Sequence, residues 1–197
     1  MFAIVEDDKI TSMPKGNKGI TIGDNQYPAS IFTLWSESER NAIGVYTVEI
    51  DETNKKDSDW YINTDITYTF SDGKVTGTYG TATARAIADT NAKDENGDDL
   101  DPVVVIEGLK TIKKKMIDNQ CADLLSPSDW MATKAFEEGG DVESGWKTWR
   151  ASVRTKCNSM QTQIDNAANV DALKALFTYT TTDGVTSRPL GEFPVKE

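Results

Sequence analysis

The strongest helical signal in this 197-residue chain is the segment WKTWRASVRTKCNSMQTQI, residues 146–164. Its apolar side chains recur every three or four residues, as in the buried stripe of an amphipathic helix: Trp146, Trp149, Val153, Cys157, Met160 and Ile164. The spacing predicts one long helix with both tryptophans and Cys157 in the core. Because the chain has no histidine to activate a thiol, we interpret Cys157 as a small buried apolar residue rather than a nucleophile.

Two more helices are predicted before this segment. Across residues 103–125 the apolar residues again recur at helical spacing, which predicts a long amphipathic helix. Ser126 followed by Pro127 is typical of a helix start, since serine caps free N–H groups and proline suits the first helical position. The helix that follows carries Trp130 and is predicted to end at Gly139.

The first half of the chain has the alternating pattern of β-strands. Residues 2–5 and 9–12 flank Asp7-Asp8, which predicts a tight hairpin at the start. Further alternating strands are predicted at 46–50, 66–70 and 75–79. No crossover helix is predicted between the strands from residue 46 onward, which favours antiparallel hairpins over a parallel sheet.

A short helix is predicted between the early strands. Ser36 and Glu39 have the spacing of a capping box, in which each side chain accepts a hydrogen bond from the other residue's backbone. This helix is expected to run to Ile43 and to stop at Gly44, because glycine commonly follows a helix end.

The charge of the chain changes abruptly at Asp101. Residues 1–101 hold 19 acidic and 9 basic residues, a net charge of −10, whereas the remainder holds 13 and 12, a net charge of −1. With the change from strand to helix patterns, this predicts an α+β protein with an N-terminal antiparallel β module and a C-terminal module of three or four helices. The predicted parts are a β module (1–88), an acidic linker (89–101), a helical module (102–178) whose last helix spans 170–177 after an Asn169 cap, and an extended C-terminal tail (179–197).

Composition excludes several classes of function. Without histidine, the chain lacks the usual general base and the commonest zinc ligand. The net charge of −11 argues against binding nucleic acid or an anionic membrane surface. No apolar run reaches the length of a membrane span, and the N-terminus has no secretory signal pattern. We therefore expect no cofactor, no nucleic-acid or membrane partner, and folding in the cytoplasm with Cys121 and Cys157 reduced, although the two cysteines could form one disulfide.

The acidic run Asp94–Asp101 holds five acids in eight residues and raises the question of calcium. Counted from Asp94, the positions where an EF-hand loop needs glycine and glutamate hold Asp99 and Val105. A solvated acidic loop is therefore the prediction. The basic run Lys113–Lys115 spreads around nearly a whole helical turn, so we interpret it as a solvated face.

Acid pairs leave an enzymatic hypothesis open. Asp57 with Asp59, and Glu137 with Glu138, are the nearest approach to the paired carboxylates of a glycosidase, but both pairs lie where solvated loop charges are expected. A carboxylate-dependent glycan hydrolase is therefore the weakest of three functional hypotheses, and no catalytic or metal-binding residue is predicted.

Aromatic and arginine side chains are better candidates for a binding surface, because tryptophan and arginine concentrate at the hot spots of protein interfaces. Two arginines lie one helical turn apart beside the apolar stripe and are expected to pair with acids of neighbouring helices or of a partner. The predicted partner-binding residues are Trp130, Trp149, Arg150 and Arg154.

These residues also carry a resemblance to a known family. The segments Leu124-Leu125-Ser126-Pro127-Ser128-Asp129-Trp130, Glu138-Gly139 and Trp146–Arg154 resemble the pattern LL-x-x-(S/T)DW … W-x-x-(Y/F/W)R-x-x-(L/V)R of bacteriophage tail assembly chaperone and tail fibre assembly proteins. Residues 19–28 and 35–44 resemble the front half of small tail-gene products of marine phages. In place of the family's proline-rich ending, this chain continues into another predicted helix, which keeps a permanent role in the virion open.

The resemblance implies a non-enzymatic protein that binds tail fibre or other tail proteins and assists their assembly or attachment. The alternative is a permanent structural component of the virion tail, baseplate or fibre. The implied partners are those tail proteins, with a homo-oligomer also open. The implied locations are the host cytoplasm during assembly and the virion tail.

Overall fold

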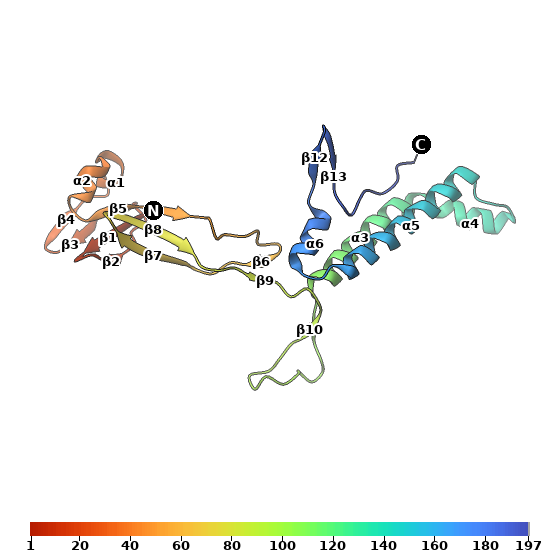
Figure 1. Ribbon diagram of the computed structural model, residues 1–197, viewed down its shortest axis with the longest axis horizontal. Coiled ribbons are helices and arrows are strands. Elements are labelled where there is room, and N and C mark those ends of the chain that lie inside the picture. Colours follow the sequence, from red (N-terminus) through yellow and green to blue (C-terminus); the bar gives the residue numbers. More distant parts are fainter. Residues whose placement is uncertain (197) are drawn as a thin grey trace. The chain divides into compact units, whose positions relative to one another are not determined.

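The computed structural model describes residues 1–196 and divides the chain into a β unit, Met1–Thr83, and a helical unit, Ala84–Glu197. Strands come first along the chain and helices follow, so the predicted α+β class is confirmed (Figure 1). The division falls earlier than the predicted end of the β module at 88. Residues after Thr83 belong to the helical unit because they bond to its first helix: Leu109 N donates to Ala86 O at 2.9 Å.

A tight hairpin opens the β unit, as predicted. Strand β1 (Phe2–Glu6) pairs antiparallel with β2 (Lys9–Ser12). The two residues between them, Asp7 and Asp8, have φ angles of 50° and 60°. A two-residue hairpin loop needs this left-handed conformation, and aspartate tolerates it better than most residues, so the local sequence selects the turn.

The main sheet has five strands in the order β2-β1-β5-β8-β7. Strand β5 (Val45–Asp51) pairs antiparallel with β1, while β7 (Ile66–Ser71) and β8 (Lys74–Tyr79) form a hairpin. Strands β5 and β8 run parallel, so the prediction of a wholly antiparallel module is wrong for this pair. The β7–β8 hairpin itself reverses the chain and inserts β8 beside β5, which makes parallel neighbours without a crossover helix.

Both faces of this sheet carry apolar side chains. Alternation along β1 places Ala3 and Val5 on one face and Ile4 on the other, so this strand contributes to two clusters. The first cluster has the buried residues Ala3, Val5, Val48 and Val75. The second has Ile4, Ile31, Phe32 and Val45, and residues of the β3 (Ile20–Ile22) and β4 (Asn25–Tyr27) hairpin and of helix α1 (Ile31–Leu34) cover it.

The predicted capping box forms at helix α2 (Glu37–Asn41). Ser36 Oγ accepts from Glu39 N at 3.3 Å, and Glu39 Oε2 accepts from Ser36 N at 2.8 Å. The helix ends before the predicted Ile43, and Gly44 then turns the chain into β5 with a φ of 80°. The N-terminal boundary is therefore set by side-chain bonds and the C-terminal one by a left-handed glycine.

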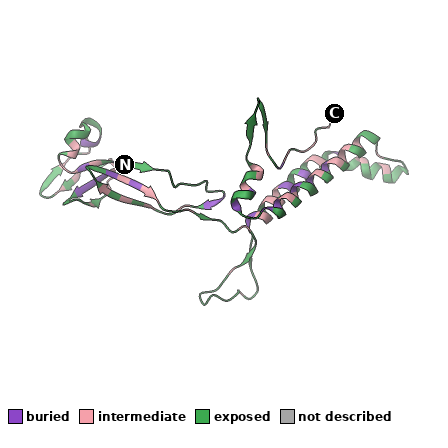
Figure 2. Cartoon of the chain, viewed as in Figure 1, coloured by how far each residue is buried: buried purple, intermediate pink, exposed green. Residues whose placement is uncertain are grey.

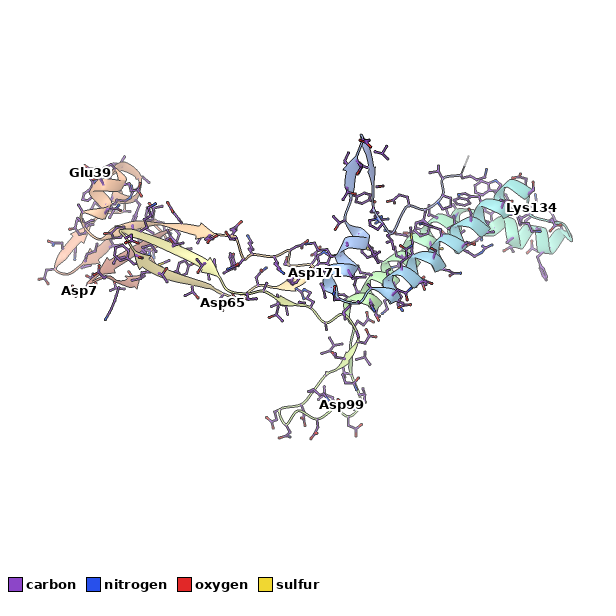
Figure 3. All side chains as sticks on the ribbon, in the orientation of Figure 1. Asp7, Glu39, Asp65, Asp99, Lys134 and Asp171 are labelled. Atoms are coloured by element: carbon purple, nitrogen blue, oxygen red, sulfur yellow. The ribbon has the colours of Figure 1, made fainter. Side chains whose placement is uncertain are left out.

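The predicted acidic linker is a hairpin arm. Strand β10 (Thr90–Asn91) pairs with β11 (Val105–Ile106), and Asp99 lies near the tip of the arm (Figure 3). The helix predicted from Val103 therefore begins only at Leu109. Valine and isoleucine favour extended backbone, and the pairing with β10 outweighs the helical spacing that the sequence shows here.

Two antiparallel helices, α3 (Leu109–Leu125) and α5 (Ser144–Asn166), form the body of the helical unit. At one end of the pair, Lys110 Nζ donates to Asp165 O at 2.8 Å. Residues along the facing stripes are buried, and Figure 2 shows buried positions along both helices. The buried residues are Leu109, Ile117 and Cys121 of α3 with Val153, Cys157, Met160 and Ile164 of α5.

A shorter helix lies at each end of this pair (Figure 1). Helix α4 (Asp129–Glu138) follows a single 3₁₀ turn, Ser126–Ser128, and ends at Gly139 as predicted, with a left-handed φ of 68°. Helix α6 (Val170–Phe177) begins at the predicted Asn169 cap, whose Oδ1 accepts from Ala172 N at 2.8 Å.

The predicted extended tail contains a hairpin and a buried anchor. Strands β12 (Thr180–Thr182) and β13 (Val185–Ser187) pair after α6, and every residue in them is exposed. Leu190 is then fully buried, and its N–H donates to Leu176 O at 3.1 Å. The remaining two-stranded pair is β6 (Tyr61–Ile62) with β9 (Thr83–Ala84).

Candidate partner-binding surface

Arg150 joins the end of α3 to the start of α4. Its Nη1 donates to Leu125 O at 2.8 Å and to Ser128 Oγ at 2.5 Å, and its Nη2 donates to Asp129 Oδ1 at 2.5 Å. The arginine side chain is only 11% exposed, whereas that of Asp129 is 62% exposed. A cation suits the last carbonyls of a helix, which carry partial negative charge and lack helical partners. The predicted pairing of Arg150 with an acid of a neighbouring helix is therefore present.

Ser128 is the one buried polar residue of the described chain, at 1% exposure. Its hydroxyl accepts from Arg150 and donates to Leu125 O at 2.9 Å, so its buried oxygen is satisfied. The prediction of Ser126 as a helix cap is wrong. Its backbone is helical, and its hydroxyl donates backward to Asp123 O at 3.5 Å instead of accepting from the helix that follows.

Helix α4 presents large apolar side chains to solvent. None of its residues is buried, Trp130 is 57% exposed and Phe136 is 88% exposed. Met131 and Ala135, one turn apart, are half-buried. Burial within the chain therefore stabilises α4 little, and an exposed aromatic surface of this kind is typical of interaction sites.

A groove of about 440 Å³ lies between α4 and the start of α5. Figure 3 labels Lys134 on the α4 side of this region. We call this hollow the Trp130–Trp146 groove, after its two aromatic walls. Its lining residues are Trp130, Met131, Lys134, Ala135, Glu138, Gly140, Asp141, Val142, Glu143 and Trp146.

Trp146 and Trp149 begin the apolar stripe of α5, but they are half-buried and not part of the core predicted for them. Their rings meet edge to face, with centroids 5.6 Å apart. The C-terminal segment lies against both, since Trp149 Nε1 donates to Pro194 O at 3.0 Å and the Lys196 ammonium lies 5.3 Å from the centre of the Trp146 ring. The stripe therefore runs past the core and ends at the groove.

The structure brings some of the predicted binding residues together and separates one. Trp130 lines the groove, Arg150 holds the turn that positions it, and Trp149 lies against the C-terminal segment. Arg154 is exposed and forms no ion pair or hydrogen bond within the described residues 1–196. Pairing of Arg154 with an acid of a neighbouring helix is therefore absent within these residues, and its pairing with an acid of a partner stays a prediction.

Several residues of the site were absent from the sequence predictions. Glu143 caps α5 by accepting from Gly145 N at 2.9 Å, and it also lines the groove. Val142 lines the groove as well, and so does Glu138, which the sequence offered only as part of an acid pair and of the family pattern. Pro194 and Lys196 reach the tryptophans from far along the chain. A glutamate just before a long helix is a recognisable start signal, whereas contacts of the tail leave no periodic pattern to find.

The two cysteines lie in the α3–α5 interface, free and buried. Burial, together with nearby Cys121 and Asp118, raises the pKa of the Cys157 thiol to about 12. The thiol therefore stays neutral at physiological pH, and only the thiolate is a strong nucleophile. The prediction that Cys157 is a buried apolar residue of the stripe is confirmed.

Among residues 1–196, no cluster of three or more histidine, cysteine or acidic side chains could hold a metal ion. In the same part of the chain, every helix is too short or too polar to cross a lipid bilayer. Comparison with models of protein families, with curated proteins and with solved structures finds no match to this chain. The candidate surface is therefore assigned from its own residues.

Proposed function

We propose that this chain is a non-enzymatic bacteriophage tail-associated protein that binds tail fibre or other tail subunits and assists their assembly or attachment. It acts by binding, through the surface formed by α4 and the start of α5. Its partners would be met in the host cytoplasm during assembly, and the bound protein could travel with the virion tail.

The observation that carries this proposal is the Arg150 contact set. The Ser-Asp-Trp and Trp-Arg segments that resemble the tail assembly family are adjacent in space, since Arg150 bonds to Leu125, Ser128 and Asp129. Those bonds hold the start of α4 and leave Trp130 exposed beside the groove. Rigid support behind an exposed aromatic side chain favours a protein-binding role, because little conformational entropy is lost on association.

Co-expression with a tail fibre gene of the same phage, followed by affinity capture of this chain, tests the proposal. We expect the wild-type chain to retain the fibre protein and the Trp130→Ala variant to retain much less of it. A central tryptophan at an interface typically contributes about 2 kcal/mol or more to the free energy of binding. Leu34→Ala is the matched control, because Leu34 is 80% exposed but lies in the β unit. Equal retention by both variants would remove the α4 surface from the proposal.

A permanent place in the virion is the second candidate, and the exposed hairpins favour it. Every residue of β10–β11 and of β12–β13 is exposed. Isolated two-stranded hairpins are only marginally stable in water, so such arms gain most by packing on neighbours in an assembly. Mass spectrometry of purified virions distinguishes the two roles. Stoichiometric presence supports a structural component, and absence supports a factor that leaves after assembly.

A further inference from the structure

The walls of the Trp130–Trp146 groove combine aromatic faces with carboxylates. Two tryptophans and the apolar Met131 and Val142 line it, and three acids stand around them against one lysine. Those acids are Glu138, Asp141 and Glu143, and the lysine is Lys134. A tryptophan face attracts a cation within about 6 Å of the ring centre, and nearby carboxylates add to the attraction.

The chain's own C-terminal segment places a cation on one of the two groove tryptophans, Trp146. Its Lys196 ammonium lies over Trp146, and its Pro194 carbonyl accepts from the Trp149 indole. The segment 192–196 belongs to no helix or strand, and Val195 between the two contacts is 85% exposed. One wall of the groove, the Trp146 ring, therefore already has a cation of this chain against it, although none of residues 192–196 lines the groove.

The positive charges near the groove are engaged with individual acids. Lys134 lies 3.9 Å from Glu138, and Lys147 lies 3.2 Å from Asp141. Glu143 bonds to the backbone of α5 and has no cation against it among the ion pairs of the described chain. Both ion pairs are largely exposed, so an incoming cation can compete for their acids at little cost.

We propose that the Trp130–Trp146 groove binds an extended segment of a partner protein through a lysine or arginine side chain of that segment. The cation lies against the tryptophan faces, and Glu138 and Glu143 supply the compensating charge. Apolar residues beside the cation fill the space over Met131 and Val142. This inference rests on the proposed function, since it names the chemistry by which a tail protein is bound.

A peptide titration tests the inference without any phage partner. The probe is the blocked peptide acetyl-Gly-Phe-Pro-Val-Lys-Gly-amide, added to the full chain labelled with 5-fluorotryptophan, and the readout is the five fluorine resonances. We expect the Trp130 and Trp146 signals to move together with one affinity. A matched peptide with norleucine in place of lysine should bind about fivefold to tenfold more weakly, because it keeps the length and loses the cation.

Variants of α4 supply matched controls for the groove. Trp130→Ala should weaken peptide binding about tenfold, whereas Phe136→Ala should leave it unchanged, because Phe136 is exposed on the same helix outside the groove. Glu138→Gln should weaken peptide binding, and its difference from the wild type should grow as the salt concentration falls. Glu137→Gln should leave peptide binding unchanged. Unchanged helical circular dichroism shows that each variant is folded.

Two results would overturn the inference: equal binding of the lysine and norleucine peptides, and no movement of the Trp130 signal. Movement of the Trp146 and Trp149 signals without that of Trp130 would mean that the peptide merely replaces the chain's own tail. Loss of fibre capture by Trp130→Ala together with a silent peptide would reject this inference and keep the proposed function. Peptide binding by a wild-type chain that captures no fibre protein would reject the proposed function and keep the cation-binding groove.

Discussion

Arg150 Nη1 and the carbonyl oxygen of Leu125 are 2.8 Å apart, so a guanidinium on α5 closes the C-terminal end of α3. Three groups share this one side chain, because Ser128 Oγ and Asp129 Oδ1 also accept from it. The planar fork of arginine can serve all three at once, which a lysine ammonium on a flexible stem cannot do. The turn that carries Trp130 depends on this geometry.

Arg150→Lys should lower the free energy of unfolding by about 1–2 kcal/mol, because at least two hydrogen bonds to a poorly exposed cation are lost. Urea unfolding followed by circular dichroism measures this. Arg154→Lys is the control and should change stability by less than about 0.5 kcal/mol, since Arg154 is exposed. Equal effects of the two substitutions would contradict the role given to Arg150.

Ser128→Ala and Ser126→Ala should differ, although the two serines are only two residues apart. Ser128 is buried and bonds to both Leu125 and Arg150, so its removal should cost about 1–2 kcal/mol. Ser126 is exposed and makes one long bond, so its removal should cost less than about 0.5 kcal/mol. The reverse order in thermal or urea unfolding would restore Ser126 as a cap.

Stability should fall at alkaline pH through Cys157. The folded thiol has a pKa of about 12, whereas an unfolded thiol titrates near pH 8.5. Between these values the unfolded chain has released a proton that the folded chain keeps, so the thiol's contribution is complete below about pH 8 and declines as the pH rises.

The measurement is urea unfolding at several pH values from about 7 to 10. Cys157→Ala should be less stable at neutral pH, because it leaves a cavity, and should lose less stability than the wild type as the pH rises. Parallel declines in the two proteins would assign the alkaline effect to other groups. A thiol reagent should also react slowly with the native chain, because both cysteines are buried. After unfolding it should react rapidly with both of them.

Gly44→Ala should destabilise the β unit, whereas Gly23→Ala should do so much less. Both glycines have positive φ, 80° and 57°. A Cβ at Gly44 would lie 2.6 Å from Val5 O, but one at Gly23 would meet nothing within 4 Å. We expect a loss of about 1 kcal/mol for Gly23→Ala from backbone strain alone and several kcal/mol for Gly44→Ala. A shared midpoint in thermal unfolding would show that the backbone near Val5 moves aside.

Local chemistry made several elements predictable. Asp7-Asp8 select a hairpin turn through their tolerance of positive φ, and Ser36 with Glu39 form their capping box within one turn. Asn169 caps α6 in the same way. Each of these features depends on residues at most a few positions apart, so no distant contact is needed to form it.

Other features depended on contacts from elsewhere in the chain. Ile106 continues the helical spacing of Leu109 and Ile112, but pairing of Val105 and Ile106 with β10 holds this segment extended. The parallel pairing of β5 and β8 follows from where the β7–β8 hairpin docks, which no local pattern encodes. Trp149 was expected in the core but instead donates to Pro194, 45 residues further along the chain.

By itself, the sequence determined the α+β order, the apolar stripe of α5, the burial of Cys157 and the candidate status of Trp130 and Arg150, because periodicity and composition act over short distances. The tertiary structure alone decided that Arg150 closes α3, that Arg154 stays free within residues 1–196, and that two tryptophans and three acids line one groove. The lining residues all lie within residues 130–146, but which of them face one hollow depends on how the turn after Gly139 places α4 beside the start of α5, and no local pattern encodes that placement.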